Sequence, residues 1–434
     1  MKNNRYLLSL LVIGMLYFIF GFVTWLNGAL IPFLQTACEL SNFLVYFVTF
    51  AFYISYFFMA IPSSKILEKI GFKNGISLGL LIMAVGAFLF IPSASLRLYP
   101  LFLAALFLLG IGLALMQTAV NPYVTIIGPL ESAAKRISVM GILNKFAGIL
   151  APLLLATLVL HDADVITEQI TTCASIQEKE ALLQMLSNRL IEPYIIMGSI
   201  LLFLAFMVRL SPLPELNEES DNDTEPKGSI FQYKHLFWGV IALFFYVGVE
   251  VVAGDTIINY GQSLGVPIET AKYFTGLTLA GMVIGYFIGV ALIPKILSQR
   301  VALIGCAVLG IIFGILILVV PVSYTFSFPF IDLMTFQQIQ MTIPYSVFFV
   351  ALLGLANALV WPAIWPLALN GVKGHTKMAS ALLIMAIAGG AIIPLVYGGI
   401  ADLTSTQVAY WIVIPCYLFI LWFAVGGYKS GGRK

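Results

Sequence analysis

Three ionisable side chains lie deep inside long apolar stretches of the sequence: Lys145, Glu250 and Asp255. A charge in such a stretch costs about 2.5–3.5 kcal/mol when the segment enters a membrane, so an ionisable residue there is a candidate for function. Asp255 and Asn259 are four residues apart and would share one face of a helix. Gly254 directly precedes the acid, and a glycine lets a helix loosen and expose carbonyl oxygens. These residue types together predict a site for a small cation.

The oxygen atoms near Asp255 favour sodium as that cation. Asp255, Thr256 and Asn259 offer a carboxylate, a hydroxyl and an amide, all of them hard oxygen ligands. A proton needs only a carboxylate that can titrate, so proton binding at Glu250 or Asp255 is the main alternative. Glu250 lies five residues before Asp255 and therefore on a different face of a regular helix. A structural interpretation is also open, in which Lys145 and one acid form a buried ion pair.

Amide side chains follow one stripe of a single apolar stretch. Gln117, Asn121 and Thr125 recur every four residues and would line one face of a helix. Amide donors and acceptors match the hydroxyl groups of a neutral sugar. Asn27 and Asn144 lie in other apolar stretches, where hydrogen bonding between helices is the structural alternative. We expect Asn27, Gln117, Asn121 and Asn144 to bind a neutral ligand that carries hydroxyl groups.

Two tryptophans occupy a matching stripe in a later apolar stretch. Asn357, Trp361 and Trp365 have the same four-residue spacing. The face of an aromatic ring packs against the C–H surface of a sugar. Tryptophan is also common where a helix meets the membrane surface, but Trp361 and Trp365 lie in the middle of their stretch. We expect Trp361 or Trp365 to stack on the same ligand.

The composition of the 434-residue chain excludes several function classes. Apolar and aromatic residues make up 61% and charged residues only 10%, whereas soluble domains average about 25% charged. The formal net charge of +2 argues against a nucleic-acid partner. Three His and four Cys, and the lack of any metalloprotease, phosphate-loop or nucleophile motif, argue against an enzyme or a resident cofactor. The chain is expected to span a lipid bilayer.

Twelve apolar stretches are long enough to cross a bilayer, which takes about 20 residues as a helix. They cover residues 7–34, 42–61, 75–95, 98–127, 137–160, 191–210, 236–262, 270–293, 301–321, 345–370, 378–400 and 408–427. Of the 22 Lys and Arg residues, 17 lie in alternate connections and four in the others. Because positive residues accumulate on the cytoplasmic side, both termini are predicted to be cytoplasmic.

The two halves of the chain repeat one another. Gln117 and Asn121 match Trp361 and Trp365 at one constant offset of 244 residues, which Gly110/Gly354 and Pro122/Pro366 share. The acidic, polar segment 211–234 separates the halves. We therefore expect bundles of six helices at 1–210 and 235–434, joined by a cytoplasmic linker at 211–234. Segment 161–190 on the opposite side has the pattern of short amphipathic helices lying on the surface.

Several motifs resemble the fucose/glucose/galactose permease family of the major facilitator superfamily. Residues 64–73 (SKILEKIGFK) are similar to that superfamily's G-x-x-x-[DE]-[RK]-x-G-x-[RK] loop, with Ser64 in place of the first glycine. The more specific motifs are LNGALIP (26–32), AFY (51–53), QTAVNPY (117–123), GP (128–129), GVEVVAGDT (248–256) and WPAIWP (361–366). The resemblance covers nearly the whole chain. It implies an all-α membrane protein of two pseudo-symmetric six-helix bundles that takes up a hexose with a cation by alternating access.

The chain departs from the proton-coupled fucose permeases at two positions. The resemblance implies acidic residues where this chain has Gly28 and Gln117, so a proton cannot bind at those two places. Sodium–hexose symport is therefore the first expectation, with Asp255 as the sodium ligand. Proton–sugar symport is the alternative, and a drug exporter on the same fold comes third. We expect a monomer in the cytoplasmic membrane of a bacterium, with no cofactor beyond a transported sodium ion.

Overall fold

The computed structural model describes residues 2–126, 133–159, 163–173, 175–211, 213, 229–293, 296–332, 337–372 and 375–430. Within these residues, twelve helical segments are long and apolar enough to cross a membrane. They coincide with the twelve predicted spans, and the edges differ by a few residues at most places. The largest difference is at the sixth segment, which begins earlier, at Ile176.

The first six spans are built from eight helices, because two spans are interrupted. They are α1 (Lys2–Trp25) with α2 (Asn27–Ala37), α3 (Asn42–Val45) with α4 (Phe47–Ile70), α5 (Phe72–Ser95), α6 (Tyr99–Ile126), α7 (Ala133–Val159) and α10 (Ile191–Leu210). In this half α5 packs between α6 and α10, and α1 packs along α7.

The last six spans contain more interruptions. They are α11 (Lys234–Asp255) with α12 (Ile257–Ser263), α13 (Ile268–Ala271) with α14 (Phe274–Leu292), α15 (Gln299–Val319), α16 (Tyr345–Asn357) with α17 (Val360–Leu369), α18 (Thr376–Met385) with α19 (Gly389–Leu403), and α20 (Thr406–Ala409) with α21 (Val413–Val425). Residues 212 and 214–228 of the predicted linker lie outside the described residues, so the division into two bundles stays a prediction.

Three spans are interrupted at or near candidate site residues. Two of the breaks lie beside Asn27 and Asp255, and the third lies between Asn357 and Trp361. The first span breaks at Leu26, just before Asn27, and the seventh at Thr256, just after Asp255. The tenth breaks at residues 358–359, where Pro362 cannot donate the backbone hydrogen bond that a helix would make to residue 358. These interruptions place polar groups at irregular backbone inside the bundle.

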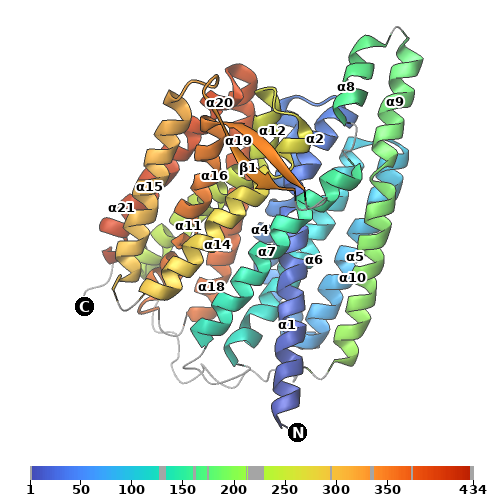
Figure 1. Ribbon diagram of the computed structural model, residues 1–434. Coiled ribbons are helices and arrows are strands. Elements are labelled where there is room, and N and C mark those ends of the chain that lie inside the picture. Colours follow the sequence, from blue (N-terminus) through green and yellow to red (C-terminus); the bar gives the residue numbers. More distant parts are fainter. Residues whose placement is uncertain are drawn as a thin grey trace.

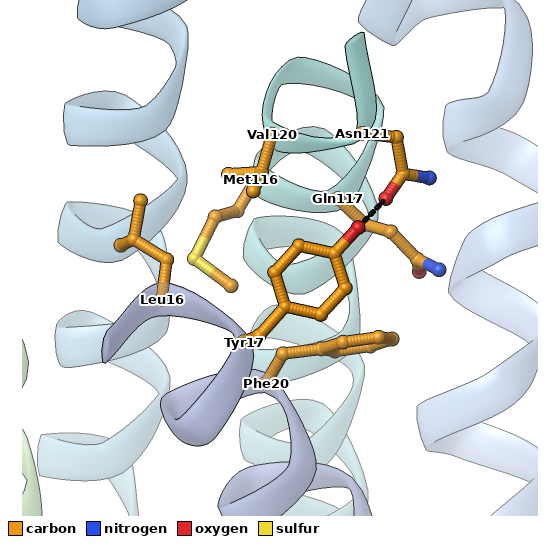
Figure 2. Close-up of a pocket in the computed structure, with 7 residues that line it drawn as sticks. All are labelled: Leu16, Tyr17, Phe20, Met116, Gln117, Val120 and Asn121. Atoms are coloured by element: carbon orange, nitrogen blue, oxygen red, sulfur yellow. Dashed lines mark hydrogen bonds between the residues drawn. The ribbon is translucent and has the colours of Figure 1, made fainter. Parts of the chain in front are cut away.

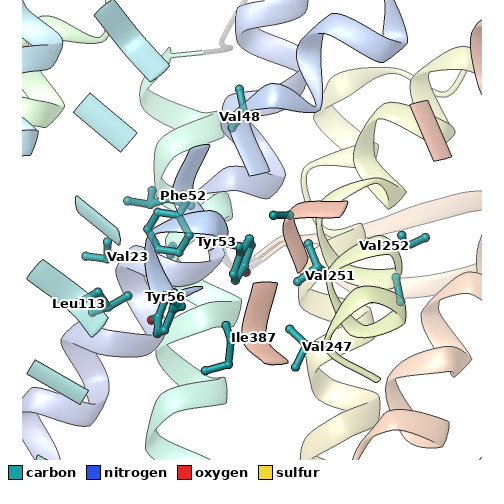
Figure 3. Close-up of a cluster of buried hydrophobic side chains, with 14 of the residues drawn as sticks. Val23, Val48, Phe52, Tyr53, Tyr56, Leu113, Val247, Val251, Val252 and Ile387 are labelled. Atoms are coloured by element: carbon teal, nitrogen blue, oxygen red, sulfur yellow. The ribbon is translucent and has the colours of Figure 1, made fainter. Parts of the chain in front are cut away.

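The two sequence halves meet along an apolar seam. Helix α4 packs against α18 and α19, and α7 packs against α14. Tyr53 of α4 lies beside Val251 of α11 and near Ile387 of the short helix η3 (Ala386–Ala388) (Figure 3). All three side chains are buried. Tight apolar packing therefore holds the halves together at the middle of the molecule.

Both chain ends lie at one end of the bundle, which we call the terminal end (Figure 1). The opposite end carries α8 (Ala163–Thr172), α9 (Ile176–Asn188) and a β-hairpin, and we call it the hairpin end. Short helices were predicted in the segment that contains α8 and α9. They stand beyond the bundle, with α9 leading into α10, and do not lie flat on it (Figure 1). Side chains of α9 fix this arrangement, because Gln184 Nε2 and Ser187 Oγ both donate to the carbonyl of Ala94.

The hairpin was not predicted from the sequence. Strands β1 (Thr325–Ile331) and β2 (Gln338–Pro344) pair antiparallel, with Thr325 opposite Pro344 and Ile331 opposite Gln338. Burial alternates strictly along β1, with Phe326, Phe328 and Phe330 on the more buried face. That two-residue alternation is the pattern of a half-buried strand and was the available sequence signal.

Candidate functional site

A buried ion pair joins the two halves of the chain. Lys145 Nζ of α7 lies 2.8 Å from Glu250 Oε1 of α11, and the side chains are only 10% and 13% exposed. The Lys145 ammonium also lies 4.7 Å from the centre of the Trp25 ring, a cation–π arrangement. This is the ion pair that the structural interpretation of the sequence proposed. It leaves the second acid of α11 without a cationic partner among the described residues.

Asp255 is fully buried, and neither carboxylate oxygen has a hydrogen-bond partner among the described residues. It is the last residue of α11, directly before the break at Thr256. An ionised carboxylate in a low-dielectric site without a partner is strongly disfavoured. Asp255 therefore needs a proton or a bound cation to neutralise it.

The neutral oxygens predicted to surround a sodium ion at Asp255 make other contacts. Thr256 Oγ1 donates to Val252 O at 2.6 Å and lies 2.7 Å from the Tyr410 hydroxyl. The Asn259 amide donates to the Tyr46 hydroxyl. The carbonyl of Gly254, expected to be exposed by a loosened helix, accepts a hydrogen bond of 2.6 Å from Thr275 Oγ1.

Trp25 fills the space between the broken first span and its neighbours. Its side chain is 2% exposed. A methyl group on Gly254 would lie 2.2 Å from the indole, and one on Gly148 would lie 2.4 Å away. Both positions therefore require glycine. Sequence reasoning did not single out Trp25, although it is the only tryptophan of the first 210 residues and lies inside an apolar stretch.

The amides of the first half gather around Tyr17. The Tyr17 hydroxyl donates to Asn121 Oδ1 at 2.8 Å, and Asn144 Nδ2 donates to the Tyr17 carbonyl at 3.4 Å. Gln117 lies one turn from Asn121 on α6, and its Oε1 is buried without a partner (Figure 2). The structure therefore brings Gln117 and Asn121 to one cavity, whereas Asn144 contacts the backbone of Tyr17. The side chain of Thr125 lies outside the described residues.

Asn27 is also unsatisfied. It is 1% exposed, and its Nδ2 has no hydrogen-bond partner. Its neighbour Gly28 packs against the seventh and eighth spans, because a methyl group there would lie 3.4 Å from Gly254 O of α11 and 2.8 Å from Thr275 Oγ1 of α14. The breaks of the first and seventh spans thus lie against each other.

The two tryptophans of α17 stack on one another. The Trp361 and Trp365 rings are 5.4 Å apart with an interplanar angle of 23°, and Tyr246 lies 6.3 Å from Trp361. Both tryptophans are partly exposed. In the described part of the chain, no hydrogen bond or ring contact joins them to the amides of α6. Asn357 faces a different helix, since its Oδ1 accepts from the Tyr417 hydroxyl at 2.8 Å.

The cavity beside the amides of α6 is small. The cavity lined by Tyr17, Gln117 and Asn121 is about 10 Å³, close to the size of one water molecule. A larger cavity of about 120 Å³ lies near the hairpin, where Ile149, Leu153 and Phe330 help to line it. None of the predicted site residues lines the larger cavity. A hexose would therefore need the amide site to open.

Comparison with known proteins identifies close relatives. The model of the family described as Major Facilitator Superfamily matches residues 13–368. A "glucose/galactose transporter" of Brucella abortus is 33% identical over 433 residues, covering 99% of this chain and 96% of that protein. An "L-fucose-proton symporter" of Escherichia coli is 27% identical, covering 99% of this chain and 94% of that protein. The crystal structure of the transporter FucP in an outward conformation matches with a TM-score of 0.69 and 25% identity, covering 99% of this chain and all of that one.

Proposed function

This chain belongs to the major facilitator superfamily, and we propose that it is a secondary transporter that carries a hexose into the cell together with a cation. The observation that carries this proposal is the 33% identity to a protein named a glucose/galactose transporter, which extends over 99% of the chain. The cluster of neutral amides inside the bundle supports it independently. We further propose that the protein lies in the cytoplasmic membrane of a bacterium with both termini in the cytoplasm.

The proposed sugar site combines amides with an aromatic platform. Gln117 and Asn121 lie together beside the Tyr17 phenol (Figure 2), and Asn144 contacts the Tyr17 backbone. The Asn27 amide nitrogen, which has no partner among the described residues, is a further donor for a sugar hydroxyl. Trp361 or Trp365 of the second half would cover the sugar ring when the halves close around it. No charged side chain belongs to this set, which suits a neutral hexose.

We propose Asp255 as the residue that binds the coupling cation. Glu250 is neutralised by Lys145, whereas Asp255 is buried without any partner. A group that must take up and release a cation during each cycle cannot be permanently paired with a lysine. Glu250 and Lys145 would instead hold the two halves together at the middle of the membrane.

The geometry makes a proton the first candidate for that cation, which reverses the order expected from the sequence. A proton needs only the carboxylate, whereas sodium would need Thr256 and Asn259 to leave Tyr410 and Tyr46. Relatives named L-fucose-proton symporters add support. Sodium remains the second candidate, because these two side chains are the neighbours of Asp255 that could turn toward it.

The position of Gly28 is consistent with proton coupling through Asp255. The resemblance to fucose permeases implied an acid at this position. Gly28 packs against the carbonyl of Gly254, the residue before Asp255. A carboxylate at either place would therefore lie beside the same break in the seventh span, and Asp255 would supply it from the second half.

A substrate panel tests the proposed function most simply. Cells that lack their own hexose carriers would express the protein and receive radiolabelled glucose, galactose, mannose, fucose or N-acetylglucosamine. We expect accumulation of at least one hexose above its external concentration, and collapse of that accumulation by a protonophore. Failure to take up any sugar, combined with export of a hydrophobic dye, would instead favour the drug-exporter alternative.

A further inference from the structure

We propose that Tyr17 determines which sugar hydroxyl the transporter recognises, by holding the amide of Asn121 in one orientation. Tyr17 itself was not among the sugar-binding residues predicted from the sequence. The inference rests on the proposed function and adds to it a source of specificity.

Tyr17 is fixed in place by three kinds of contact. Its hydroxyl donates to Asn121 Oδ1 at 2.8 Å. Its backbone carbonyl accepts from Asn144 Nδ2 at 3.4 Å. Its ring meets the edge of Phe20, with centroids 6.3 Å apart and an interplanar angle of 77°. The phenol points toward α6, as Figure 2 shows.

The Tyr17 hydroxyl orients the Asn121 amide. Because Asn121 Oδ1 accepts from this hydroxyl, the donor Nδ2 lies on the other side of the amide, and Figure 2 shows this nitrogen pointing away from Tyr17. Turning the amide over would leave the Tyr17 hydroxyl hydrogen without this acceptor, which carries a free-energy cost in a partly buried site. Asn121 is thus a hydrogen-bond donor of fixed direction.

Gln117, unlike Asn121, is not held in one orientation by a hydrogen bond. It makes no hydrogen bond to any described residue, and its Oε1 is buried without a partner. Its amide can therefore turn to suit a ligand, and a donor that reached Oε1 would satisfy it. The two amide nitrogens point to the same side, so both residues face one region (Figure 2).

A single hydroxyl group fits this pair. It can accept a hydrogen bond from Asn121 Nδ2 and donate one to Gln117 Oε1 at the same time. A sugar that lacks that hydroxyl would leave the buried Gln117 Oε1 and the Asn121 Nδ2 without a ligand partner, and sites built in this way reject such analogues strongly. Without the Tyr17 hydroxyl, the Asn121 amide could turn freely, and discrimination at that position would weaken.

Replacing Tyr17 by phenylalanine removes only the hydroxyl. Binding of D-galactose, D-glucose and a series of their monodeoxy analogues would be measured by calorimetry for wild type, Tyr17→Phe and Asn121→Ala. We expect Tyr17→Phe to bind the preferred hexose roughly tenfold more weakly. We also expect one deoxy analogue, strongly rejected by the wild type, to approach the affinity of the parent sugar. Adding Tyr17→Phe to Asn121→Ala should cost nothing further, because the hydroxyl acts through that amide.

Tyr194→Phe is the matched control. Tyr194 is buried in α10 and stacks on Phe90, with no hydrogen bond from its hydroxyl to a described residue. It should leave both the affinity and the deoxy-sugar profile unchanged. A wild-type profile in Tyr17→Phe would overturn this inference while leaving the proposed function intact. Absence of hexose binding and of hexose uptake by the wild type would instead contradict the proposed function, and the inference with it.

Discussion

Asp255 and Glu250 lie in one helix but have different surroundings. Glu250 faces Lys145 across the seam between the halves, and Asp255 faces no cation among the described residues. All three residues were candidates from the sequence, and their spacing predicted that the side chains of the two acids lie on different faces of one helix. The sequence did not predict which acid contacts Lys145, because that contact joins positions 105 residues apart.

The Lys145–Glu250 pair gives a prediction about stability at the residue scale. Lys145→Met should destabilise the protein by about 3–5 kcal/mol, because Glu250 would remain buried without its partner. Adding Glu250→Gln should recover much of that loss, since no charge is then left unpaired. Thermal unfolding of detergent-solubilised protein measures both variants. Equal loss in the single and double variants would show that the pair does not act as a unit.

The contacts of two aromatic residues could not be predicted from the sequence. Tyr17 and Trp25 both lie in the long apolar stretch of the first span, where aromatic side chains are expected as ordinary packing. Only the tertiary structure shows that one orients Asn121 and that the other fills the space beside Gly148 and Gly254. Polar residues in apolar stretches were easier to recognise, because burying them is costly.

At the scale of elements, apolar length and glycine position carried most of the predictive information. Twelve stretches of about 20 apolar residues are expected to cross a bilayer as helices. Gly254 correctly indicated where the helix of the seventh span is interrupted. The hairpin after α15 was missed, although the alternation along the seven residues of β1 is a strand signal that the sequence contains. The close approach of the first and seventh spans also depends on packing that no single stretch encodes.

The break between α11 and α12 should tolerate no side chain at Gly254. Gly254→Ala places a methyl group 2.2 Å from the Trp25 ring, so the indole must move, and overpacking of this kind costs about 1–3 kcal/mol. We expect a lower unfolding temperature and slower transport. Trp25→Leu should partly rescue Gly254→Ala in both measurements. A Gly254→Ala variant as stable and as active as wild type would contradict the tight fit of Trp25.

Asp402 connects elements of the two halves at the hairpin end. Its Oδ1 accepts from the Asn42 backbone N–H and from Asn42 Nδ2, each at 2.9 Å, and its Oδ2 accepts from the Phe43 N–H at 2.8 Å. The carboxylate of α19 thus caps the first turn of α3. We expect Asp402→Ala to loosen this end.

Cys38, in the turn between α2 and α3, reports on that loosening. Burial raises the pKa of its thiol to about 11, despite the opposing effect of nearby Arg97. At neutral pH the thiolate is therefore scarce, and maleimide labelling should be slow and should rise with pH. In a Cys173→Ser background, Asp402→Ala should label Cys38 several-fold faster than the parent, and the exposed control Glu192→Ala should not. Unchanged labelling in Asp402→Ala would show that the end stays closed without this cap.

At the scale of the whole molecule, the ion pair, the proposed cation site and Trp25 lie where the two halves meet. Lys145 and Trp25 come from the first half, and Glu250, Gly254 and Asp255 from the second. Uphill transport requires that occupancy of the cation site changes the affinity for sugar, and the reverse. A cation site at the seam could exert that effect, because relative movement of the halves changes its surroundings and those of the sugar site together.

Accumulation of hexose in proteoliposomes under imposed gradients tests this account most directly. With no sodium present, an inward proton gradient should drive the preferred hexose above its external concentration. Asp255→Asn should abolish that accumulation while retaining sugar binding, and the exposed variant Glu192→Gln should behave as wild type. Accumulation that ignores the proton gradient but follows a sodium gradient would identify sodium as the coupling ion. Gradient-driven accumulation that survives in Asp255→Asn would contradict the central claim that Asp255 binds the coupling cation.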